Sequence, residues 1–127
     1  MNKFGAVLFV NDVARMRAFY EAVAGLSVTE AGPTWARLGT GAFELVVHGI
    51  PPHIAATFET SSPPERREEA AIKLVFPVAD IAIARATAAR LGGELNPPDR
   101  EWQLGSERIC DGVDPEGNVF QVRAETP

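Results

Sequence analysis

The stretch "FGAVLFVNDVARMRAFYEAVAGLSV", residues 4–28, returns in diverged form as "IKLVFPVADIAIARATAARLGGELN", residues 72–96. The two copies align without gaps, and Asp12 in the first copy corresponds to Asp80 in the second. Similarity between two parts of one chain is the signature of a repeated structural unit. The sequence therefore predicts a fold built from two copies of the same unit.

A second pair of similar segments sets the length of each unit. "AFELV" at 42–46 resembles "VFQVR" at 119–123, and the longer spacing shows that the second copy has a longer middle. We place module one at about residues 3–50 and module two at about 71–125. The Pro-, Ser- and charge-rich residues between them, about 51–70, are expected to form a long surface connection. The whole chain, 1–127, is predicted to be a single domain.

Each copy is expected to begin with an apolar strand that leads into a helix. Asp12 and Asp80 stand where a helix N-cap is needed, each just before a pattern of apolar residues at i, i+3 and i+4. Glycines at 25 and at 92–93 are suited to end these helices. The predicted strands are 4–10, 26–30, 34–38 and 43–48 in the first copy, and 72–78, 93–96, 107–111 and 119–123 in the second.

Composition narrows the function classes. The 127 residues carry a net charge of −5 with a pI of about 5.0, which disfavours general binding to nucleic acid or to an anionic membrane. The apolar run "GAVLFV" at 5–10 is far shorter than the ~20 residues that span a bilayer. The single cysteine, Cys110, excludes an internal disulfide and is predicted to be a buried structural thiol in a cytoplasmic protein.

Two βαβββ units that contain "VNDVARMRAFY" (10–20) and "DPEGNVFQ" (114–121) resemble the vicinal oxygen chelate superfamily. This superfamily includes glyoxalase I, bleomycin-resistance proteins, extradiol dioxygenases and fosfomycin-resistance enzymes. The resemblance covers nearly the whole chain. It implies an α+β fold in which two tandem modules form a curved mixed sheet around a ligand cavity, often across a homodimer.

The resemblance also implies where a metal ion would bind, and the residues there are unsuitable. The four ligand positions fall on Gly5, Glu44, Lys73 and Gln121. Glycine has no side chain, and an ammonium group repels a cation. Glu44 and a neutral amide are too few for a tight divalent site, and His48 lies ~13 Å along the strand from Glu44. We therefore expect no metal and no other cofactor.

Strand alternation then predicts which side chains line the cavity. The ligand positions mark the concave face, and the opposite face of the same strands is apolar and expected to pack under the helices. The predicted ligand-binding residues are Trp35, Arg37, Glu44, His48, Lys73 and Gln121. Trp102 either closes one end of the pocket or packs in the core, and the core is favoured.

Lys73 and Glu44 raise a separate hypothesis. A buried ammonium needs a partner, so the two side chains either pair with each other or reach solvent independently. Glu44 is also the candidate for general-base catalysis, with Lys73 as an alternative amine catalyst.

Three functions remain open on these grounds. The first, which we favour, is a metal-free, homodimeric protein that binds a small neutral or anionic organic ligand, of the sequestration or resistance type. The second is a glyoxalase-like lyase or isomerase, or a dioxygenase, with a non-standard metal site or metal-independent acid–base chemistry. The third is an interaction module with a filled barrel.

Overall fold

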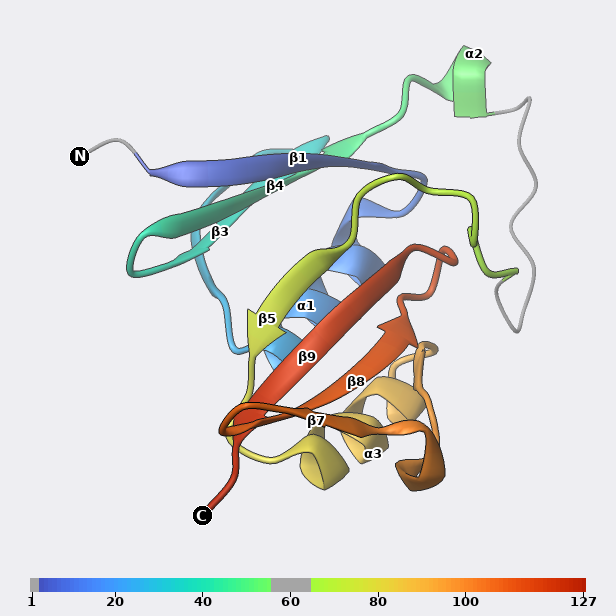
Figure 1. Cartoon of the computed structure of the whole chain (residues 1–127). Helices are drawn as coiled ribbons and strands as arrows, with labels where there is room; N and C mark the ends of the chain where they lie inside the picture. Colours follow the sequence, from blue (N-terminus) through green and yellow to red (C-terminus); the bar gives the residue numbers. More distant parts are fainter. Residues whose placement is uncertain (1–2, 56–64) are drawn as a thin grey trace.

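Each copy of the repeat folds into its own sheet and helix, as the sequence predicts (Figure 1). The computed structural model describes residues 3–55 and 65–127. The elements are β1 (Phe4–Val10), α1 (Val13–Ala24), β2 (Ser27–Ala31), β3 (Trp35–Thr40), β4 (Phe43–Gly49), α2 (Pro52–Ala55), β5 (Leu74–Pro77), α3 (Ile81–Arg90), β6 (Glu94–Leu95), a 3₁₀ turn (Pro98–Arg100), β7 (Trp102–Leu104), β8 (Glu107–Val113) and β9 (Val119–Glu125).

The two sheets have the same topology. The first has the order β1-β4-β3-β2, and the second has the order β5-β9-β8-β6 with β7 added against β8. In both, the first strand runs parallel to the last strand of its module, and the remaining pairs are antiparallel. This is the βαβββ arrangement, and it confirms the α+β fold class. Within the described residues, no helix is long and apolar enough to cross a membrane.

Both long helices begin at the predicted aspartates. The Asp12 carboxylate accepts a hydrogen bond from the N–H of Arg15 at 3.0 Å, and the Asp80 carboxylate accepts one from Ile83 at 3.1 Å. Helix α1 ends at Gly25, whose φ of 67° lies in the left-handed region that glycine adopts without strain.

The core lies between the helices and the inner faces of the two sheets. Tyr20 of α1 packs against Phe76 of β5 and Phe120 of β9, with ring centroids 5.5 and 5.9 Å apart. The predicted apolar face is buried along most of its length, but Phe4 and Ile72 are 88% and 79% exposed. Phe4 begins an edge strand, and Ile72 precedes β5, so neither is covered by a helix.

A buried carboxylate organises the turn between β8 and β9. Asp114 is fully buried and accepts hydrogen bonds from the Tyr20 hydroxyl at 2.6 Å, from the backbone N–H groups of Glu116 and Asn118, and from the Asn118 side chain. Burial raises the pKa of Asp114, although these hydrogen bonds act in the opposite direction. Because Tyr20 belongs to the first module, this contact also joins the two modules.

The same turn caps the first module. The Glu116 carboxylate accepts hydrogen bonds from the N–H groups of Asn11 at 2.8 Å and Asp12 at 2.9 Å, where β1 passes into α1. The second module has no counterpart of this contact. The N–H groups of Ala79 and Asp80, which correspond to those of Asn11 and Asp12, have no hydrogen-bond partner among the described residues. The equivalent turn of the first module, between β3 and β4, is too short to reach these N–H groups. A cavity of about 440 Å³ lies between that turn and the start of α3.

We expect Glu116→Ala to lower the free energy of unfolding by about 1–2 kcal/mol, because it removes charge-assisted hydrogen bonds to partly buried backbone N–H groups. Glu94→Ala is the matched control, since Glu94 is exposed and its side chain makes no hydrogen bond or ion pair with the described residues. Urea unfolding monitored by circular dichroism measures both. Equal losses in the two variants would contradict the assignment.

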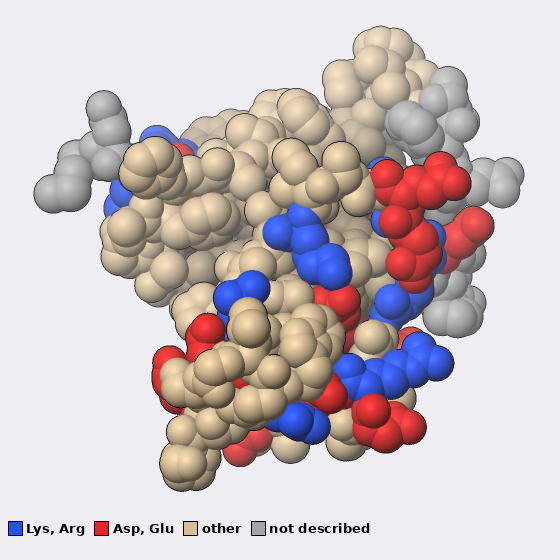
Figure 2. Space-filling view, viewed as in Figure 1, with Lys and Arg blue, Asp and Glu red and all other residues tan. Residues whose placement is uncertain are grey.

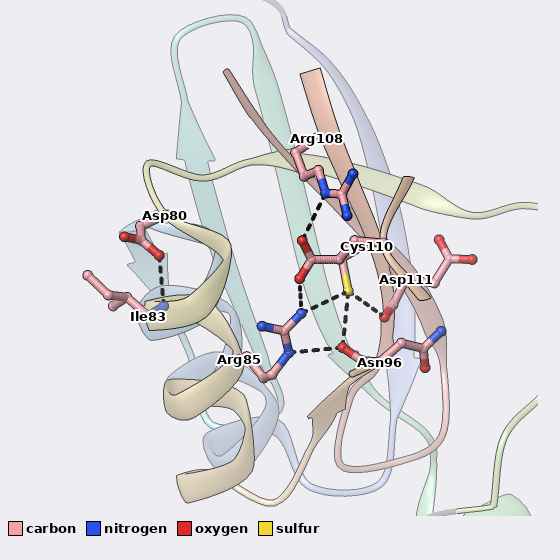
Figure 3. Close-up of polar contacts among 8 residues, drawn as sticks. Asp80, Ile83, Arg85, Asn96, Arg108, Cys110 and Asp111 are labelled. Carbon is pink, nitrogen blue, oxygen red and sulfur yellow. Dashed lines mark hydrogen bonds and ion pairs between the residues drawn. The ribbon is translucent and has the colours of Figure 1, made fainter. Parts of the chain in front are cut away.

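A polar cluster fixes the segment that follows β6 (Figure 3). Arg85 of α3 donates to the Asn96 carbonyl at 2.9 Å and pairs with Glu101, which also accepts from Arg108 at 3.1 Å. Cys110 is buried, as predicted, and burial raises the pKa of its thiol. It lies beside Arg85.

The position of Trp102 differs from the one favoured on sequence grounds. The favoured interpretation placed it in the core, but its side chain is 40% exposed. It begins β7, a short strand that pairs with the N-terminal part of β8 and that the sequence did not predict. Because a strand of three residues at this position has no helix over it, its side chains stay at the surface.

The contribution of Glu101 to the free energy of unfolding should depend on pH. Burial raises its pKa, but the ion pairs with Arg85 and Arg108 outweigh burial, so the net pKa is lowered. A carboxyl whose pKa is lower in the folded state stabilises the fold above its unfolded pKa and loses this effect as pH falls through the folded value. We expect Glu101→Gln to cost about 1–2 kcal/mol at pH 7 and clearly less near pH 3. A loss independent of pH in chemical unfolding would refute this.

Candidate functional site

One concave face belongs to the first sheet and carries a neutralised arginine. Arg37 of β3 donates from Nε to Glu44 of β4 at 2.8 Å and from Nη1 to Glu30 of β2 at 3.2 Å. The hydrogen bond to Glu44, followed by that to Glu30, raises the pKa of Arg37. The three side chains form one ion-pair network across three neighbouring strands.

The rest of this face is apolar and aromatic. Trp35 lies opposite His48 in the β3–β4 register, and the rings of Phe9 and His48 are 5.7 Å apart. Val7 and Phe9 are 56% and 59% exposed, although both are large apolar residues. In Figure 2 the surface over this sheet is mostly uncharged, whereas charged side chains gather over the second module. The first concave face thus presents an exposed apolar surface.

The concave face of the second sheet is a chain of polar contacts. Lys73 Nζ lies 2.8 Å from Asp111 Oδ2, and the Gln121 amide donates to Asp111 Oδ1 at 3.1 Å. The Gln121 carbonyl accepts from Arg123 Nε at 2.8 Å, and Arg123 lies 3.8 Å from Glu107. Each of these polar side chains therefore already has a polar partner within the second module.

The hypothesis that Lys73 pairs with Glu44 is wrong. Lys73 pairs with Asp111 on its own sheet, and Glu44 pairs with Arg37 on the other sheet. Asp111 is the residue of this face that the sequence did not single out. Its position directly opposite Gln121 in the β8–β9 register was the signal that could have placed it on this face.

The donor set does not fit a metal centre. A side chain at position 5 would place its Cβ 2.3 Å from the backbone oxygen of Glu44, so β1 can approach β4 only with glycine there. The amide oxygen of Gln121 is bound by Arg123, and the ammonium of Lys73 repels a cation. No group of three or more His, Cys, Asp or Glu residues suited to a metal occurs in residues 3–55 and 65–127.

One cavity lies between the modules, and a smaller one lies beside it in the connection and the second module. The larger, of about 500 Å³, is lined by β1, β5 and the start of β9. The smaller, of about 230 Å³, is lined by Arg66, Arg67, Glu68, Ala70, Ile72, Lys73, Asp111 and Val119. Of the six predicted ligand-binding residues, Lys73 lines the smaller cavity. Trp35, Arg37, Glu44 and His48 lie together on the first sheet, and Gln121 lies on the second.

The model of the glyoxalase-like domain family matches residues 5–123. The chain belongs to this family. It is therefore a member of the vicinal oxygen chelate superfamily, as the sequence resemblance implied. No curated protein sequence matches the chain significantly.

Solved structures share the family fold over nearly the whole chain. A glyoxalase/bleomycin resistance protein/dioxygenase family enzyme from Burkholderia phytofirmans PsJN is 22% identical, with a TM-score of 0.68 and coverage of 99% of this chain and 100% of that chain. A bleomycin resistance determinant encoded on transposon Tn5 is 15% identical, with a TM-score of 0.61 and full coverage of both chains. The fosfomycin resistance protein FosX from Mesorhizobium loti is 16% identical, with a TM-score of 0.63 and coverage of 99% and 92%.

We expect the glyoxalase-like chain to remain without stoichiometric metal after incubation with zinc, nickel or manganese and desalting, as measured by mass spectrometry of the metals. The physical reason is that only Glu44 supplies a charged donor at the family positions. Lys73→His is the informative variant, because it replaces the ammonium with a ligand. One tightly held metal per wild-type chain would contradict the expectation.

Proposed function

We propose that this glyoxalase-like protein binds a small, neutral or anionic organic ligand without a metal at the family positions. One observation carries the proposal. The concave face of the first sheet exposes large apolar side chains, while the charged side chains of both sheets already form ion pairs with one another. Apolar area supplies affinity, and a few fixed polar groups orient a ligand. Sequestration of a toxic compound is one use of such a site, and names among the fold relatives include bleomycin and fosfomycin resistance proteins.

The concave faces also support a homodimer. Val7 and Phe9 on β1, Val75 on β5 and Leu104 on β7 are large apolar side chains exposed in the single chain. Exposed apolar patches of this kind mark surfaces that bind a ligand or another protein. We propose that a second copy of the chain covers part of them and closes the cavity.

Acid–base chemistry at Glu44 is the alternative function. One Glu44 oxygen accepts a hydrogen bond from Arg37, and the other accepts none from the described residues. A ligand on the first sheet could therefore donate a proton to this second oxygen. Glu44 is the residue that would make the protein a metal-independent lyase or isomerase.

Phe9→Glu tests ligand binding and the dimer together. We expect light scattering after size exclusion to give twice the 13.7 kDa chain mass for the wild type and a shift towards the single chain for the variant. We expect small neutral and anionic aromatic fragments to perturb the amide NMR signals of β1, β4, β5 and β9 in the wild type. Phe9→Glu should weaken these effects because it places a charge on the apolar face.

Ile83→Glu is the matched control, since Ile83 is 66% exposed but lies on α3, away from the concave faces. It should leave mass and fragment binding unchanged. Fragments that perturb only residues outside the four strands would overturn the binding proposal. A single-chain mass for the wild type would overturn the dimer alone.

A further inference from the structure

A cavity between the two modules shares part of its wall with a smaller cavity formed by the connection and the second module. Ala70, Ile72 and Val119 line both the cavity of about 500 Å³ and the cavity of about 230 Å³. Ligand pockets are commonly 300–1,000 Å³ in volume. The two cavities therefore adjoin, and the larger one has the volume of a small-molecule site.

The larger cavity is suited to an apolar group. Val7 and Leu8 of β1 line one side, and Leu74 of β5 and Phe120 of β9 line the other. Tyr20 also lines this cavity, but its hydroxyl donates to the buried carboxylate of Asp114. Because that hydroxyl is already engaged, Tyr20 offers mainly its ring to a molecule in the cavity.

The smaller cavity is lined by more basic than acidic side chains. Arg66 pairs with Glu68 at 3.5 Å, and Lys73 pairs with Asp111 at 2.8 Å. The guanidinium of Arg67 makes no ion pair or hydrogen bond with any described residue. Two cations are thus balanced by two carboxylates, and one positive charge remains.

Arg67 is held in place by its backbone. Its N–H donates to the carbonyl of Gly117 at 2.9 Å, and its own carbonyl accepts from Ala70 at 3.3 Å. Gly117 belongs to the turn that Asp114 fixes. Lys73 has three N–H donors, and the bond to Asp111 uses one of them. Arg67 and Lys73 both line the smaller cavity, so each can offer N–H donors to a molecule bound there.

We propose that the protein binds an organic monocarboxylate, with its apolar body in the larger cavity and its carboxylate between Arg67 and Lys73. This inference rests on the proposed ligand-binding function and narrows it to a chemical class. A guanidinium matches a carboxylate in geometry and binds it through two parallel hydrogen bonds. The single surplus charge favours a monoanion over a dianion, because a second negative charge would lie near Asp111 and Glu68 without a partner.

Three ligands that share one flat apolar body test the charge preference: 2-naphthoate, 2-naphthamide and 2-naphthylmethylamine. 2-Naphthyl phosphate adds the dianion. Titrations followed by amide NMR at about 0.15 M salt give both the dissociation constant and the location. We expect the carboxylate to bind about fivefold more tightly than the amide, the size of one solvent-exposed ion pair, and the amine to bind more weakly than the amide.

Two variants and a control assign the effect to named residues. Arg67→Gln should remove the advantage of the carboxylate over the amide and leave amide binding unchanged. Asp111→Asn should strengthen carboxylate binding, because it removes a carboxylate that competes for Lys73. Arg90→Gln removes an exposed positive charge at the end of α3 and should change nothing.

The outcomes separate the two proposals. Equal binding of carboxylate and amide, tighter binding of the amine, or tighter binding of the phosphate would overturn the monocarboxylate inference and leave the ligand-binding function in place. Shifts confined to residues outside the two cavities would overturn the location. Binding of none of the four ligands at millimolar concentration would count against both proposals.

Discussion

The buried carboxylate of Asp114 is the interaction on which the arrangement of the two modules depends. A carboxylate removed from water is costly unless hydrogen bonds satisfy its oxygens, and here they come from Tyr20 of the first module and from the turn itself. The turn that results places Glu116 on the amides of Asn11 and Asp12 and the Gly117 carbonyl on Arg67. Tyr20 and Asn118, which both bond Asp114, also line the cavity between the modules, so this contact positions part of its wall.

The two copies of the repeat kept one topology and diverged in chemistry. The first concave face is apolar and aromatic around a compensated arginine, whereas the second is a chain of charged and amide side chains. Only the second copy has the long turn that reaches its neighbour, so the first copy leaves a cavity at the equivalent place. A ligand between the modules therefore meets two unlike walls, which is a physical basis for orientation.

The likeness to solved structures concerns the fold, and the site has its own chemistry. At the positions where relatives are implied to hold a metal, this chain has a glycine required by the close approach of β1 to β4 and a lysine bound to Asp111. Positive charge is thus provided by fixed side chains. Such charges bind anions without needing an ion from solution, and their strength depends on how many neighbouring carboxylates compete for them.

The sequence by itself determined the repeat, the helix caps at Asp12 and Asp80, eight of the nine strands found in the described residues and most of the buried face. These features follow from local periodicity and from the chemistry of single residues. It also determined that Gly5 and Lys73 are poor metal ligands. Tertiary structure alone decided that Lys73 meets Asp111, that Trp102 is exposed on β7, and that Arg67 lines a cavity. Those outcomes depend on strand register, sheet order and the packing of distant segments, which no local pattern encodes.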